Sequence, residues 1–154
     1  MRLVLISLLS ITCFLVITST STAQDKGFGM GLIVGEPTGI SFKGWLSSST
    51  AFDAGVAWSF ARGSALHIHA DYLIHSFDAI KSEAKVPIYY GIGGRFKAAD
   101  RTDARLGARG VVGIAYFLPS APIDLFFEVA PILDFAPATE FSVNGGFGAR
   151  YFFR

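Results

Sequence analysis

The chain has 154 residues with a formal net charge of +1, and 51% of them are hydrophobic against 16% charged. This length suits one domain. The charge lacks the basic excess of nucleic-acid-binding proteins, so we expect no nucleic-acid partner. The single cysteine, Cys13, cannot build a disulfide framework or a zinc–thiolate site.

The N-terminal residues have the pattern of a Sec-type secretory signal. A basic residue precedes an apolar run over residues 3–17, and small residues fill the −3 and −1 positions before Gln24. We therefore predict a signal peptide over residues 1–23, cleaved before Gln24, and one domain over residues 24–154. A retained membrane anchor is the alternative, although the run is shorter than the ~20 residues of a transmembrane helix. Cleavage would remove Cys13 and leave no reactive thiol.

After the signal, large apolar residues alternate with small or polar ones, which is the period of a β-strand. The alternation recurs in eight segments, which we interpret as eight strands. In chain order these are "FGMGLIV" (28–34), "ISFKGWL" (40–46), "AFDAGVAWSF" (51–60), "LHIHADYLIHSFD" (66–78), "IYYGIGGRF" (88–96), "RLGARGVVGIAYFL" (105–118), "IDLFFEVAPILD" (123–134) and "FSVNGGFGARYFF" (141–153). Turn-forming residues separate most of them, at 35–38, 47–50, 61–64, 99–103, 119–122 and 136–139.

Three features fit this pattern less simply. Pro131 lies inside the seventh segment, where a proline cannot donate to a neighbouring strand, so we expect a bulge or an early end of pairing. Trp45 falls on the face of small residues, so it either fills the interior or marks a bulge. Residues 76–86 make the only long connection, and an even strand count places this connection on the same side as both termini, which we expect to be periplasmic.

The charged residues inside the predicted strands fall on the face opposite the large apolar side chains, and the remaining charged residues fall in turns or at the termini. Those on this face are Lys43, Asp53, Asp71, Arg95, Lys97, Arg105, Arg109, Asp124, Glu128, Asp134 and Arg150. Small residues mixed with balanced charges suit an enclosed interior, where charges must be paired. The apolar face, with tyrosines and Trp58 near strand ends, would then point into lipid. This pattern predicts an all-β fold, a closed antiparallel eight-stranded transmembrane β-barrel with a side-chain-filled lumen.

Several of these stretches carry a resemblance to a known class of protein. The stretches are "GLIVGEPTGISFKGWLS", "FDAGVAWSF", "LHIHADYLIHSFD", "PIYYGIGGRFK", "APIDLFFEVAPILDFAP" and "NGGFGARYFF". In them the chain resembles the small outer-membrane barrels of the OmpA/OmpX type, and most of all a family of uncharacterised bacterial outer-membrane barrel domains. The resemblance implies a bacterial outer-membrane location and outer-membrane lipids as partners, and it brings no activity with it.

The C-terminal stretch "FGARYFFR" resembles the sorting signal that the barrel assembly machinery reads. Phe147, Tyr151 and Phe153 stand at alternating positions in it. The stretch departs from the usual pattern in ending on Arg154 instead of an aromatic residue. The resemblance makes the barrel assembly machinery an expected partner.

All three histidines lie in "LHIHADYLIHSFD". On a strand, His67, His69 and Asp71 point to one face, as metal ligands would. We interpret the row instead as part of a lumenal polar network without metal, cofactor or catalytic role, and keep the three residues as candidate ligands. His75 and Ser76 are adjacent and face opposite ways, so they cannot pair as base and nucleophile. The predicted network consists of Lys43, Asp53, His67, His69, Asp71, Arg95, Arg105, Arg109, Asp124, Glu128 and Arg150.

Three functions remain open at this point. The first is a non-enzymatic integral outer-membrane protein with a structural role, or with a surface-binding role in which short loops contact a host or envelope protein. The second is a barrel-embedded lipid-modifying hydrolase or metal-dependent enzyme that uses the strand of His67 and His69. The third is a soluble periplasmic lipocalin-like carrier, whose aromatic face would point inward around a ligand.

Overall fold

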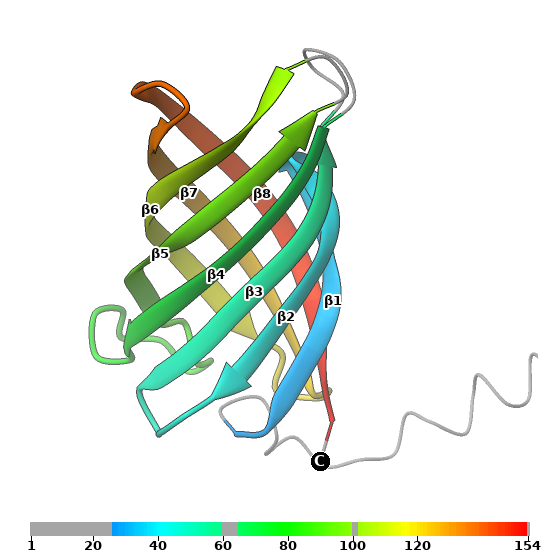
Figure 1. The fold of residues 1–154 in the computed structure, drawn as a ribbon. Coiled ribbons are helices and arrows are strands. Elements are labelled where there is room, and N and C mark those ends of the chain that lie inside the picture. Colours follow the sequence, from blue (N-terminus) through cyan, green and yellow to red (C-terminus); the bar gives the residue numbers. More distant parts are fainter. Residues whose placement is uncertain (1–25, 60–64, 100–101, 154) are drawn as a thin grey trace, which may run out of the picture.

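The computed structural model describes residues 26–59, 65–99 and 102–153, and the predicted signal peptide lies outside them. These residues form antiparallel strands that pair in chain order, and β1 also pairs with β8, which closes the barrel (Figure 1). The strands are β1 (Phe28–Glu36), β2 (Thr38–Trp45), β3 (Thr50–Ser59), β4 (Ala65–Ser76), β5 (Ile88–Ala99), β6 (Thr102–Phe117), β7 (Ile123–Ala136) and β8 (Glu140–Phe153). The prediction of an all-β, closed, antiparallel barrel of eight strands is confirmed. Within the described part of the chain, no helix has the length and hydropathy of a membrane span.

Burial along the strands alternates with the period of the pleat. In β4 every second residue from Ala65 to His75 is buried, and the residues between them are exposed or half-buried. Most large apolar residues of the predicted outer face are exposed, with exposed fractions of 69% for Ile92 and 67% for Phe141. The sequence pattern therefore assigned the two faces correctly, because side-chain direction in a strand depends only on position along it.

The two ends of the barrel carry different connections. One end holds the start of β1, the finish of β8 and the connections over residues 46–49, 77–87 and 118–122, and we call it the termini end (Figure 1). The opposite end includes the one-residue connection at Pro37 and residues 137–139. The longest described connection thus lies on the same side as the first and last strand ends, as an even strand count requires.

Pro131 interrupts one of the two ladders of β7. Toward β8 it pairs with Val143, but toward β6 the ladder passes from Arg109↔Ile132 to Val112↔Val129 without a pair for Pro131. A proline has no amide hydrogen to donate, so pairing lapses on this side. The expected interruption is present, and it affects β6 alone.

Candidate functional site

Residues that point into the barrel form rows that cross from strand to strand along the ladders. One row consists of Lys43, Asp53, Asp71, Gly93 and Arg109 on β2 to β6. A second consists of Asp124, Arg150, Gly31, Ser41, Gly55, His69, Arg95, Gly107 and Asp134, and it runs around the whole circumference. Charges far apart in the chain become neighbours in these rows.

Glycines stand between many of the interacting side chains, on the strand that separates them. The pairs that meet over a glycine are Asp71–Arg109 over Gly93, Tyr89–Glu128 over Gly113, Arg95–Asp134 over Gly107 and Ser41–Arg150 over Gly31. At Gly93 an added Cβ would overlap the Asp71 carboxylate and the backbone of β4. The missing side chain is what lets residues two strands apart bind each other directly.

The largest group of charges, which we call the central cluster, is built around two arginines. Its members are Lys43, Asp53, His69, Asp71, Arg109, Asp124, Glu128 and Arg150, and all are buried. Arg150 pairs with Asp53 and donates from Nε to Asp124 Oδ1 at 3.1 Å. Its guanidinium also lies 3.9 Å from the centroid of the Phe126 ring. Arg150 of β8 therefore bridges β3 and β7 through the lumen.

Arg109 makes the second bridge of the central cluster. Its Nε donates to Asp71 Oδ2 at 2.8 Å, and its Nη2 donates to Glu128 Oε1 at 2.8 Å. These two bonds join β6 to β4 on one side and to β7 on the other. Buried charges are tolerated only when they are paired in this way, and removing one partner typically costs about 3–5 kcal/mol.

A smaller group of charges, which we call the rim group, lies near the opposite end. It consists of Arg95, Arg105, Asp134 and Glu140. Arg95 and Asp134 are buried and paired, whereas the Arg105 side chain is 29% exposed and pairs with the more exposed Glu140. Arg105 therefore takes part in the polar network through Asp134 as well, but it lies at the mouth of the barrel because it stands near the start of β6.

The histidine row divides into three different environments. His67 is buried, and neither ring nitrogen has a hydrogen-bond partner among the described residues. His69 places Nε2 3.8 Å from Asp53 Oδ1. His75 Nε2 lies 2.7 Å from Lys43 Nζ. The three rings thus do not act as one group, although all three point inward.

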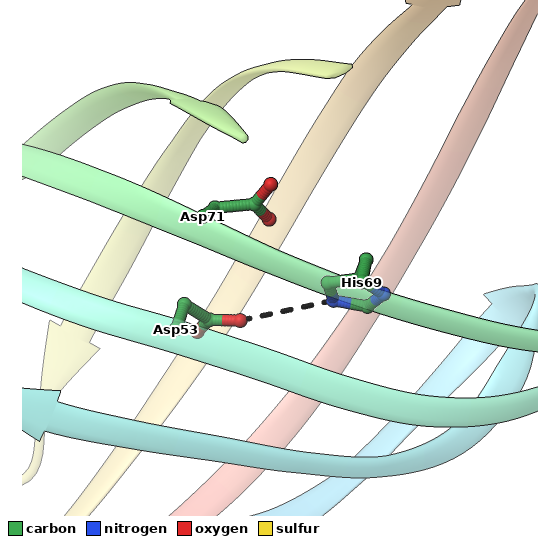
Figure 2. A group of neighbouring side chains, drawn as sticks. All are labelled: Asp53, His69 and Asp71. Carbon is green, nitrogen blue, oxygen red and sulfur yellow. Dashed lines mark ion pairs between the residues drawn. The ribbon is translucent and has the colours of Figure 1, made fainter. Parts of the chain in front are cut away.

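The candidate metal ligands only partly coincide with the expected set. The structure brings His69 and Asp71 together with Asp53 of β3 (Figure 2), and His67 is not part of this group. The reason is the register of β3 and β4, which places Asp53 directly opposite Asp71, whereas His67 lies opposite an alanine. Of the three candidate residues, His69 and Asp71 therefore lie in one group, with Asp53 of the neighbouring strand as its third member.

Aromatic rings fill the lumen at the termini end. This group consists of Trp45, His75, Phe77, Tyr89 and Phe117. The Trp45 ring centroid lies 4.5 Å from that of His75 and 6.2 Å from that of Phe117. Of the two expectations for Trp45, filling of the interior is therefore the correct one.

The predicted network lacked several interior or rim residues with polar contacts, among them Ser41, His75, Tyr89, Asp134 and Glu140. The first four fall on the same alternating face as the predicted members, and the alternation had already placed Asp134 among the inward charges. Ser76 is exposed while His75 is buried, so the two face opposite ways as expected.

A small pocket connects the central cluster with the opposite end. It is lined by His69, Arg109 and Glu128 of the cluster and by Glu36 and Pro37 at the β1–β2 turn, among others. Its volume of about 10 Å³ admits about one water molecule. The interior is thus packed, and it has no room for an apolar ligand at this place.

The residues of the predicted sorting signal lie on the outer face of β8. Phe147 and Phe153 are exposed and Tyr151 is half-buried, and the rings of Tyr151 and Phe153 lie 5.2 Å apart. They form one outward row, as their spacing requires. Arg154 lies outside the described residues.

By its fold and interior, the molecule is a small closed β-barrel with an ion-paired lumen and an apolar outer surface. Comparison of the chain with protein-family models, with curated proteins and with solved structures finds no match in any of the three. The functional conclusion therefore depends on the residues themselves.

Proposed function

We propose that the chain is a non-enzymatic integral protein of the bacterial outer membrane, with a structural or surface-binding role in the envelope. The observation that carries this proposal is the inside-out distribution of side chains. Large apolar residues are exposed on every strand, whereas the paired charges are buried inside the barrel. Monomeric soluble proteins rarely expose contiguous apolar surface beyond a few hundred Å², so a continuous apolar exterior favours lipid as the solvent.

The dimensions of the strands support the same proposal. β4 has 12 residues, which at ~3.3 Å per residue and a tilt of ~40° rise about 30 Å along the barrel axis. Such a length covers the ~25 Å apolar band of an outer-membrane barrel. Exposed aromatic residues lie near both ends: Tyr90, Tyr116 and Phe153 near the termini end, and Trp58 near the opposite end. Such positions suit interfacial belts.

The expected partners follow from this placement. Lipids would cover the outer face, and the barrel assembly machinery would read the row of Phe147, Tyr151 and Phe153 after Sec-dependent export. The described connections at the opposite end, Pro37 and residues 137–139, are short. Any host or envelope protein bound there would contact a small surface.

The two other functions receive less support. A lipocalin-like carrier needs the aromatic face to point inward, whereas Phe52, Tyr72 and Phe147 point outward and the interior is charged. Two serines near the histidine strand do not suit a hydrolase, since Ser41 is bound to Arg150 and Ser76 points outward, away from His75. The proposal therefore keeps to a non-enzymatic role.

Cysteine labelling tests the membrane location. In a Cys13→Ser background, Ile68→Cys and Ile92→Cys would be reconstituted in lipid vesicles, with Ser48→Cys in the exposed β2–β3 connection as the control. We expect the two strand positions to react only with an apolar maleimide, because lipid covers them, and Ser48→Cys to react with a charged one. Equal reaction of all three cysteines with the charged reagent would contradict the proposal.

A further inference from the structure

We propose that the barrel interior binds one divalent transition-metal ion, of the Zn²⁺ or Mn²⁺ kind, between Asp53, His69 and Asp71. Imidazole nitrogen and carboxylate oxygens are ligands that such ions accept. The inference rests on the interior of the barrel alone. It is therefore independent of whether the barrel lies in a membrane.

The ligand atoms already lie close to one another. One ligand atom from each of the three residues lies within 4.8 Å of the others, and His69 Nε2 is 3.8 Å from Asp53 Oδ1. Donors around a tetrahedral ion with bonds of ~2.0–2.2 Å are ~3.3–3.6 Å apart. Side-chain rotations that move these atoms by about an ångström would bring all three within bonding distance of one ion. Figure 2 shows the Asp53 carboxylate directed at the His69 ring, with Asp71 beside them on β4.

Each of the two carboxylates has one oxygen held by an arginine, and its other oxygen contacts no arginine among the described residues. Asp53 Oδ2 pairs with Arg150, and Asp71 Oδ2 accepts from Arg109. Asp71 Oδ1 has no hydrogen-bond partner among the described residues, although Asp71 is only 2% exposed. A buried charged oxygen without a partner is costly, and an ion bound there would satisfy it.

The ladder places the two carboxylates against each other. Asp53 and Asp71 are directly paired residues of β3 and β4, both pointing inward. Like charges in directly opposite positions destabilise a sheet unless a positive group lies between them. The site proposed here is the place where such a group would act on both.

The charges of the central cluster leave room for one more cation. Its described members include three basic residues, Lys43, Arg109 and Arg150, and four acidic residues, Asp53, Asp71, Asp124 and Glu128. With neutral histidines the cluster is left with one negative charge. This net negative charge would attract a cation, and one bound divalent ion would take the sum of the cluster to +1.

Two glycines make the space in which the ligands stand. A Cβ at Gly55 would overlap the His69 ring, and a Cβ at Gly93 would overlap Asp71 Oδ1. Arg109 and Arg150 hold the remaining carboxylate oxygens and so orient the ligands, as outer-shell partners do in metal sites. The pocket between His69 and Pro37 offers space for a coordinating water on the side of the opposite end.

Metal titration of the purified barrel tests the proposal. The full chain, refolded and stripped with EDTA, would be titrated with Zn²⁺ and with Mn²⁺ by calorimetry. We expect one ion per chain and tighter binding of Zn²⁺ than of Mn²⁺. Asp53→Asn, His69→Gln and Asp71→Asn should each weaken Zn²⁺ binding at least ~10–100-fold, which is the loss seen when only an outer-shell partner is removed.

His67→Gln is the matched control, because His67 is a buried histidine of the same strand outside the ligand group. It should bind Zn²⁺ with unchanged affinity. An equal loss in His67→Gln and His69→Gln would overturn the assignment. Absence of binding at ~1 mM Zn²⁺ by wild-type protein with intact β-type circular dichroism would also overturn it.

A spectroscopic measurement covers the case in which the ligand variants do not fold. X-ray absorption of the zinc-loaded wild-type protein should show one imidazole nitrogen, with oxygen atoms as the remaining ligands. A shell with two or more imidazoles, or with none, would contradict the site.

Discussion

At the scale of single residues, inward-facing glycines decide which polar side chains meet. Asp71 and Arg109 lie on β4 and β6, and they bind each other because Gly93 on β5 leaves the space between them open. A larger residue there would separate the two charges inside a medium where an unpaired charge is costly. Glycine in a strand is ordinarily unfavourable, so its use at these positions is linked to the ionic interior.

A pair of glycine substitutions tests this role. Gly93→Ala should lower the free energy of unfolding by about 1–3 kcal/mol, because its Cβ overlaps Asp71 and the β4 backbone. Gly44→Ala is the matched control, since an added Cβ there has nothing within 4 Å, and it should be neutral or slightly stabilising. Urea unfolding of the refolded variants measures both values, and equal effects would refute the role of Gly93.

At the scale of the strands, the alternation of side chains gives each strand one face toward the lumen and one toward the outside of the barrel. β7 shows this clearly, because its buried and exposed residues alternate from Asp124 to Phe135. The exposed residues are apolar and include Phe127, Val129 and Leu133. The buried residues include the charged residues of β7, which are Asp124, Glu128 and Asp134. A strand of a soluble barrel has the reverse arrangement, so the solvent of the outer face is the property to test.

The substitution Val129→Arg tests whether lipid or water covers the middle of β7. If lipid covers Val129, the substitution should cost about 2–4 kcal/mol in a vesicle-embedded barrel. If water covers it, the effect should lie within about 0.5 kcal/mol, as for ordinary surface changes. Thr139→Arg in the exposed β7–β8 connection is the control and should stay within the smaller range in either case. Equilibrium unfolding in the presence of vesicles gives both numbers.

At the scale of the whole molecule, closure and the ionic interior stabilise each other. Pairing of β1 with β8 leaves no strand edge open. The arginine bridges of the central cluster then join strands on different sides of the lumen, as Arg150 of β8 does with Asp53 of β3. A barrel of eight strands has just enough interior for side chains, so these bridges and the aromatic group at the termini end fill it.

Such a barrel should behave in solution as a heat-modifiable membrane protein. We expect the purified chain to require detergent, to give a β-type circular dichroism spectrum, and to migrate differently on a denaturing gel before and after boiling. The shift is expected because the closed, ion-paired barrel resists the gel detergent until heat unfolds it. A folded monomer that stays soluble without detergent would contradict the membrane proposal.

The sequence by itself determined the strands, their number and the face on which each residue lies. These properties are local, since a period of two depends only on neighbours along the chain. The tertiary structure alone decided which inward residues touch, because contacts depend on the offset between paired strands and on closure. Thus Asp53 stands opposite Asp71 and near His69, while His67 stands apart. The same pairing brought Asp134 to Arg95 across Gly107, and its place near the start of β6 left Arg105 at the rim.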